Sequence, residues 1–194
     1  MIVHGCRFST IALVHFLFRT LLQLVLGPRR RRVGVWDVTR TPFHVLPTDL
    51  DVNRHMNNGV YFSVLDLARI DFLQRCGLWR DLQRRGWYPV VAAETITFRR
   101  SLTLWQRFEV ETRLTGYGQR SVYIEQRMVV DGEVWASAHI RGRFLRKSGG
   151  VVPMEDLVAV TGPAPDDARM PEWLGRWGDD TALPSTKAPA PSDW

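Results

Sequence analysis

One segment of this chain is apolar around most of a helical circumference, and it constrains the fold more than any other feature. The segment is "GVYFSVLDLARIDFLQRCG" at residues 59–77. Its apolar side chains recur at helical spacing on two flanks: Tyr61, Val64, Leu65, Ala68 and Phe72 on one, and Leu67, Ile70 and Leu73 on the other. A helix with so little polar surface is buried in a folded protein. Asn58 is the expected N-cap, and Gly77 stands where the helix should stop.

The segments after residue 89 change from helical spacing to the period of two that is typical of strands. Apolar and polar residues alternate in "PVVAAETITFRR", "RFEVETRLTGYG", "RSVYIEQRMVV" and "VWASAHIRGRFLR", and Asp131-Gly132 predicts a hairpin turn between the last two. The earlier segment "VWDVTRTPFHVLP" is also typical of a strand, which Pro42 places at an edge or a bulge. Together these elements predict an α+β fold, in which a curved antiparallel sheet wraps around the long buried helix.

Length and cysteine content favour one globular domain in a reducing compartment. The chain has 194 residues, of which 45% are hydrophobic, so it can bury one core of ordinary size with segments left over at its ends. The two cysteines, Cys6 and Cys76, lie far apart and form no CxxC or Cys/His cluster, which argues against a disulfide framework and against structural zinc. We therefore expect a cytoplasmic protein that needs no metal.

The chain divides into three parts by composition. Residues 1–33 hold an apolar stretch and a run of arginines, residues 34–160 hold the periodic segments of the domain, and residues 161–194 are rich in proline. We expect this tail to be largely irregular, with at most one short helical turn around Trp173 and Trp177.

The N-terminal part has three possible placements. The apolar stretch "FSTIALVHFLFRTLLQLVL" at residues 8–26 precedes "GPRRRR", and His15, Arg19 and Gln23 recur every four residues, so a helix would carry one thin polar stripe. Such a helix could lie in a membrane interface, with the arginines on lipid phosphates, and this is the placement we favour. It could instead span the membrane and leave the domain in the cytoplasm, or pack on its own domain or on a second subunit.

The net charge of +6 is compatible with several kinds of partner, including nucleic acid, an anionic membrane and a phosphorylated ligand. The arginines are dispersed apart from one run, and the sequence holds no nucleic-acid-binding motif, so we expect no nucleic-acid partner. Phosphate on a small ligand or on a membrane surface is the better interpretation, although heavy use of arginine also follows from genome composition alone.

The loop before the buried helix, within "DLDVNRHMNNGVY" at residues 49–61, carries residue types that are suited to hydrolysis. In an extended segment alternate residues share one side, so Asp51, Asn53 and His55 would point the same way. The start of a helix supplies unpaired backbone N–H groups that can stabilise an oxyanion. A carboxylate beside it could attack a carbonyl or activate a water, as cleavage of an ester-like bond requires. Asp- and Asn-rich loops also serve simply to turn the chain and cap the helix.

The string D-x-D-x-N-x-H-x-N-N, followed by Tyr61 and a helix start, resembles the signature of hotdog-fold thioesterases, particularly the acyl-CoA and acyl-ACP (acyl carrier protein) hydrolases. The resemblance covers about residues 36–148 and implies the same architecture as the periodicity. It implies an acyl-thioester hydrolase with no cofactor beyond the coenzyme A of its substrate. A single hotdog unit implies at least a homodimer, with the site at the subunit junction. The N-terminal apolar segment is similar to that of a subgroup of animal proteins in this superfamily whose activity is poorly defined.

The resemblance assigns roles to three loop residues. Asp51 matches the acidic residue that serves as nucleophile or general base. Asn53 and His55 match the amide and imidazole that position the substrate and the water. Asp49 is more typical of a turn-former than of a second catalyst.

The same resemblance implies how the helix start binds substrate. Asn57 and Asn58 would close the loop, and Gly59 or its neighbour would provide the backbone donor to the thioester oxygen. The acyl chain would run beside the helix, against residues such as Tyr61 and Phe98.

Three further charged residues are candidates for substrate binding. Glu94 falls on the apolar side of its strand, where burial would raise its pKa, as in many active sites, unless it pairs with an arginine. Asp66 and Arg69, one helical turn apart, predict a structural pair. Arg99 and Arg143 lie near strand ends and could hold the phosphates of coenzyme A.

A second function class fits the same sequence. The chain could be a catalytically silent hotdog module that binds acyl groups, or a membrane-tethered scaffold, because a fold alone does not determine function.

Overall fold

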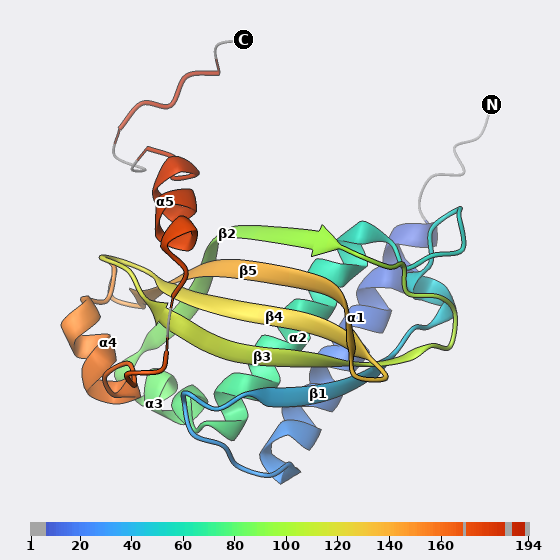
Figure 1. Ribbon diagram of the computed structural model, residues 1–194, viewed down its shortest axis with the longest axis horizontal. Helices are drawn as coiled ribbons and strands as arrows, with labels where there is room; N and C mark the ends of the chain where they lie inside the picture. Colours follow the sequence, from blue (N-terminus) through green and yellow to red (C-terminus); the bar gives the residue numbers. More distant parts are fainter. Residues whose placement is uncertain (1–6, 169, 185–187, 193–194) are drawn as a thin grey trace.

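The computed structural model holds one five-stranded sheet and one long helix at its centre (Figure 1), and it describes residues 7–168, 170–184 and 188–192, with side chains from residue 17 onward. The strands are β1 Thr39–His44, β2 Trp87–Phe98, β3 Arg107–Tyr117, β4 Val122–Val130 and β5 Glu133–Arg146. They are ordered β1-β3-β4-β5-β2, and every neighbouring pair is antiparallel. The predicted α+β architecture is therefore confirmed.

Two local predictions for the sheet are confirmed. Pro42 lies in β1, which is an edge strand, so its missing N–H costs the sheet no hydrogen bond on the open side. Asp131 and Gly132 connect β4 to β5 with positive φ angles of 49° and 81°. Both central residues of the most common two-residue hairpin turn have this backbone conformation, which Asp and Gly tolerate well.

The helix α2 (Asn58–Arg75) runs behind the sheet and is buried on both predicted flanks. Its side chains pack with the inner faces of the strands in two adjoining core clusters. Gly77 follows the C-cap residue Cys76 with a φ of +83°, as expected for a glycine that ends a helix. The N-cap is Asn57 rather than the expected Asn58, because the Asn57 side chain accepts a hydrogen bond from the Gly59 N–H.

The alternation in β2 is interrupted by an irregularity at Ala92. The pairing of β2 with β5 shifts register between Val91 and Ala93, so Ala92 is an extra residue in the strand. Val91 therefore shares the inner face with Glu94, whereas the sequence pattern placed Val90 and Ala92 on that face.

The N-terminal helix α1 (Arg7–Leu26) packs beside α2 on the side of the sheet away from the viewer (Figure 1). Two residues of its predicted polar stripe, Arg19 and Gln23, are buried against the domain, and the side chain of the third, His15, lies outside the described residues. Its apolar side chains face outward instead: Leu17, Phe18, Leu21, Leu22, Val25 and Leu26 are exposed. The polarity of this helix is thus the reverse of that of an ordinary surface helix. Among the described residues, no helix is both long enough and apolar enough to cross a membrane.

Five shorter helical segments complete the described chain. They are the 3-10 turns η1 Gly27–Arg29 and η2 Pro47–Asp49, and the helices α3 Leu78–Arg85, α4 Met154–Thr161 and α5 Glu172–Asp180. The connection to α5 crosses the face of the sheet opposite α2 (Figure 1). Trp173 of α5 packs edge-on against His139 of β5, with 4.9 Å between the ring centroids. This helix occupies the region where the sequence predicts one short turn.

Candidate active site

The loop between β1 and α2 is a closed turn rather than an extended segment. Leu50 and Met56 pair as an antiparallel bridge, and the Asp51 N–H donates to the His55 carbonyl at 2.8 Å. The Asp51 carboxylate closes the turn from inside, because its Oδ1 accepts the N–H groups of Asn53 at 2.8 Å and of His55 at 3.2 Å. The assumption that alternate residues share one side therefore does not hold in this loop.

The remaining polar side chains of the turn face solvent. Asn53 and His55 are exposed, and Val52 at the tip is 96% exposed. Within the described part of the chain, neither the Asn53 amide nor the His55 imidazole makes a hydrogen bond through its side chain. Both groups are thus available to a bound molecule, and Asp51 is half-buried beside them.

The start of α2 leaves one backbone donor unused. The N–H groups of Gly59 and Val60 donate to the side chain and to the carbonyl of Asn57, both at 2.9 Å. The Tyr61 N–H donates to the same carbonyl at 3.3 Å. Among the described residues, the N–H of Asn58 has no acceptor. The free donor at the helix start is therefore that of Asn58, the neighbour of Gly59.

Tyr61 belongs to the core rather than to an open binding surface. Its side chain is 2% exposed, its hydroxyl accepts the Leu102 N–H at 3.1 Å, and its ring packs edge-on against Phe98 at 4.9 Å between centroids. Burial raises the pKa of the Tyr61 hydroxyl, although the Leu102 hydrogen bond opposes the shift. The geometry thus gives Tyr61 a role in fixing the neighbouring strand end.

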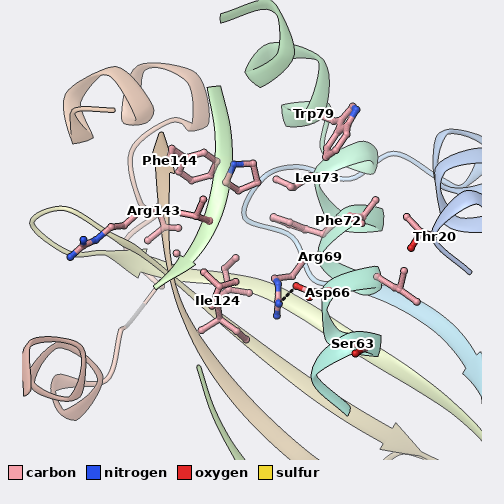
Figure 2. A pocket seen from close by; sticks show the side chains of 18 residues that line it. Thr20, Ser63, Asp66, Arg69, Phe72, Leu73, Trp79, Ile124, Arg143 and Phe144 are labelled. Carbon is pink, nitrogen blue, oxygen red and sulfur yellow. Dashed lines mark hydrogen bonds and ion pairs between the residues drawn. The ribbon is translucent and has the colours of Figure 1, made fainter. Parts of the chain in front are cut away.

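An apolar groove runs beside α2, between this helix and β2 (Figure 2). Its volume is about 360 Å³, and it begins at Ser63, one helical turn after Gly59, and extends to Leu73 and Trp79. Of the predicted site residues, Arg143 borders the groove, but its side chain points away from α2 (Figure 2), and its Nε is buried without a hydrogen-bond partner among the described residues. Asp51 and the other predicted residues of the loop and helix start do not line this groove.

A charged cluster lies on the wall of the groove. Arg69 donates to Gln126 Oε1 and to Glu94 Oε1, each at 2.6 Å, and it also binds the Asp66 carboxylate (Figure 2). The predicted pairing of Asp66 with Arg69 is confirmed. Burial raises the pKa of the Glu94 carboxyl, while the adjacent Arg69 opposes the shift. Glu94 is therefore a paired internal carboxylate beside the groove.

The other arginine proposed to bind phosphate lies at a strand end. Arg99 follows β2 and forms an exposed ion pair with Glu133 at 3.4 Å. The groove also includes Thr20 from α1 and Trp79 from α3. The sequence carries no signal for these two residues, because helices far apart in the chain bring them together.

Comparisons with known proteins agree with the observed fold. A family model described as the thioesterase-like superfamily matches residues 45–178. The protein THEM6 of Xenopus laevis is 41% identical over 99 residues, which are 51% of this chain and 48% of the frog protein, so the match spans about half of that relative. THEM6 of Drosophila melanogaster is 26% identical over 180 residues, or 90% of each chain. The structure of YbaW from Escherichia coli shares the fold, with a TM-score of 0.59 at 24% identity over 63% of this chain and 94% of YbaW.

Proposed function

The chain belongs to the thioesterase-like superfamily, and from this premise we propose that it hydrolyses acyl thioesters carried on coenzyme A or on an acyl carrier protein. The observation that carries the proposal is the pairing of Leu50 with Met56. This pairing brings the two ends of the loop together, with the Asp51 carboxylate at one end and the unused Asn58 N–H at the other.

In the proposed reaction, the thioester oxygen accepts the Asn58 N–H at the start of α2, where the helix dipole also favours negative charge. Asp51 takes a proton from water as the water attacks the carbonyl carbon, the carbon–sulfur bond breaks, and the proton passes to the sulfur of the leaving thiol. In the alternative, Asp51 attacks the carbonyl carbon itself and the thiolate leaves and takes a proton from solvent. Water then hydrolyses the resulting mixed anhydride, which releases the acid and restores the Asp51 carboxylate. Asn53 and His55, both exposed beside Asp51, orient the substrate and the water.

The groove beside α2 is the proposed site for the acyl group. Its walls are mainly apolar, which suits a hydrocarbon chain. Arg99, at an exposed strand end, and Arg143 are the proposed contacts for the phosphates of the carrier, and both would bind them outside the groove, because the Arg143 side chain points away from it (Figure 2).

We further propose that the active unit is a homodimer paired along β2. This edge strand is 12 residues long, and an exposed edge of that length invites pairing with another strand. Because the groove lies beside β2, a second copy would bring the groove to the subunit junction. Analytical ultracentrifugation tests the proposal directly, and a monomer at micromolar concentration would contradict it.

The activity is tested by measuring release of free thiol from a panel of acyl-coenzyme A thioesters of different chain lengths. Asp51→Asn keeps the oxygen that accepts the two loop N–H groups and removes only the charge. We expect it to lower the rate at least about tenfold. The matched control is Asp37→Asn, since Asp37 also accepts a backbone N–H in an exposed turn, at 2.7 Å from Gly34. No turnover on any thioester by an intact, folded dimer would exclude the proposal.

One observation favours the second function, that of a silent acyl-binding module. The loop residues do not line the groove of their own subunit, so a groove can bind acyl groups without any catalytic residue nearby. Binding of a non-hydrolysable acyl-coenzyme A analogue, together with no thiol release from the natural thioester, would favour this function.

We also propose that α1 lies in a membrane interface. Its outward face is apolar, and Arg29, Arg31 and Arg32 follow it as exposed cations, a combination that suits an anionic bilayer. The wild type should sediment with vesicles that contain phosphatidylserine, and Leu21→Glu should reduce the bound fraction. Trp105→Glu, at an exposed apolar residue outside α1, is the control and should bind as the wild type does. Equal sedimentation of all three proteins would contradict the proposal.

A further inference from the structure

The helix α1 is joined to the loop before α2 by an ion pair that is closed to solvent. Arg19 on α1 is 8% exposed and Asp49 is 1% exposed. The guanidinium Nη2 and Nη1 donate to Asp49 Oδ2 at 2.9 Å and to Oδ1 at 3.3 Å. Nη2 also donates to the His44 carbonyl at 3.0 Å, at the end of β1. A bidentate pair of this kind fixes the orientation of both partners, and its loss would leave a buried charge without compensation.

Asp49 in turn holds both ends of the loop that carries Asp51. Its Oδ2 accepts the Leu46 N–H at 2.8 Å, before the loop begins. Its carbonyl accepts the Asn57 N–H at 2.8 Å, at the N-cap of α2. Asn57 is also the residue whose side chain and carbonyl use the first N–H groups of α2, which leaves the Asn58 N–H free. The orientation of Asp49 therefore determines where the free donor lies relative to Asp51.

A second polar contact joins the next turn of α1 to the domain without touching this loop. Arg30 donates to Gln23 Oε1 at 2.9 Å and to Asp71 Oδ1 at 2.8 Å. Asp71 is fully buried and lies near the C-terminal end of α2. The two contacts hold successive turns of α1, at Arg19 and Gln23, but they lead to different parts of the domain, and only the contact through Arg19 reaches the loop.

We infer that Arg19 is a positioning residue for the loop that carries Asp51, so that α1 is a structural part of the site rather than a detachable tether. Its effect on catalysis rests on the proposed hydrolase function. Arg19 acts through Asp49 on the backbone of the loop, and it does not contact the reacting atoms itself. A displacement of about 1 Å at such a site can lower a rate by about a hundredfold.

The test compares Arg19→Met with Arg30→Met in the full chain, because each variant removes one cation that pairs with a buried carboxylate of the domain. Amide hydrogen exchange in peptides that cover residues 46–58 is measured by mass spectrometry, alongside thiol release from the acyl-coenzyme A panel. Arg19→Met should raise exchange in this loop at least about tenfold over the wild type. It should also lower kcat more than it raises KM, because Arg19 itself does not line the groove. Arg30→Met should change neither the amide exchange of the loop nor kcat, although it also destabilises the protein.

Arg19→Lys provides a graded variant if Arg19→Met does not fold. Lysine keeps the charge but cannot form the bidentate pair with Asp49. The amide exchange rate of the loop should therefore lie between the rate in the wild type and the rate in a fully released loop. Equal loop exchange in Arg19→Lys, Arg30→Met and the wild type would overturn the inference, and so would a uniform rise in exchange across the whole domain in Arg19→Met. If no form of the protein hydrolyses a thioester while Arg19→Met still loosens the loop selectively, the hydrolase proposal fails and the positioning role of Arg19 stands.

Discussion

Substitution of Asp71 by alanine should be among the most destabilising single changes in this protein. The Asp71 side chain is fully buried and accepts hydrogen bonds from three residues: Arg30 at 2.8 Å, Thr41 at 2.7 Å and Arg75 at 3.3 Å. Alanine would leave two guanidinium groups and one hydroxyl without their acceptor. The loss of one partner from a buried ion pair costs about 3–5 kcal/mol in the free energy of unfolding.

The cost can be converted into a shift of the melting temperature. For a chain of this size, each 1 kcal/mol lowers Tm by about 2–4 °C, so Asp71→Ala should lower Tm by about 6–20 °C. Calorimetry gives Tm, and urea unfolding followed by tryptophan fluorescence gives the free energy. Asp66→Ala is the matched control on the same helix, because the Asp66 side chain is also paired with an arginine but is 64% exposed. Its cost should be about 0–1 kcal/mol. Similar small shifts for both variants would refute the reasoning from burial.

Three further predictions concern single residues. Because burial raises the folded-state pKa of Glu94 above its ordinary value of 4.5, wild-type stability should fall as pH rises through the interval between these two values. Glu94→Gln should remove that decline, and urea midpoints with parallel pH dependence in both proteins would contradict it. Asn57→Ala removes the N-cap of α2 and should cost about 0.5–2 kcal/mol in the free energy of unfolding, whereas an unchanged urea midpoint would argue against the cap. Burial raises the pKa of the Cys76 thiol to about 11, so in a Cys6→Ser background an aromatic disulfide reagent at pH 8 should react slowly until urea unfolds the chain; immediate reaction of the folded protein would contradict this.

The architecture could be predicted from the sequence because local and global signals agree. The helix at 59–77 has no polar face broad enough for a surface position, and the segments after it have a period of two. Asp131-Gly132 and Pro42 mark a turn and an edge through their own backbone chemistry. Each of these signals acts within a few residues, so no knowledge of distant contacts was needed.

The candidate site could be predicted only in part, because tertiary contacts decide its details. Asn57 and Asn58 are equivalent as capping residues, and the hydrogen bond from the Asn57 N–H to the Asp49 carbonyl selects Asn57. The turn around Asp51 is closed by its own carboxylate, which an alternation rule cannot anticipate.

The orientation of α1 likewise depends on residues outside it. Its polar stripe is visible in the sequence, but an amphipathic helix usually turns its apolar side to the core. Here the domain buries two carboxylates, those of Asp49 and Asp71, which require cationic partners. Arg19 and the arginine run after the helix supply them, and the apolar side is left facing outward.

This reversed polarity limits how the N-terminal segment can change in evolution. An ordinary targeting segment can be replaced by another, since the domain that follows it folds without it. In this protein a foreign N-terminal segment without matching arginines would leave the buried Asp49 carboxylate without its cation and would remove one of the two arginine partners of Asp71. We therefore expect the N-terminal segment and the buried carboxylates that pair with it, Asp49 and Asp71, to change together in evolution or to stay together.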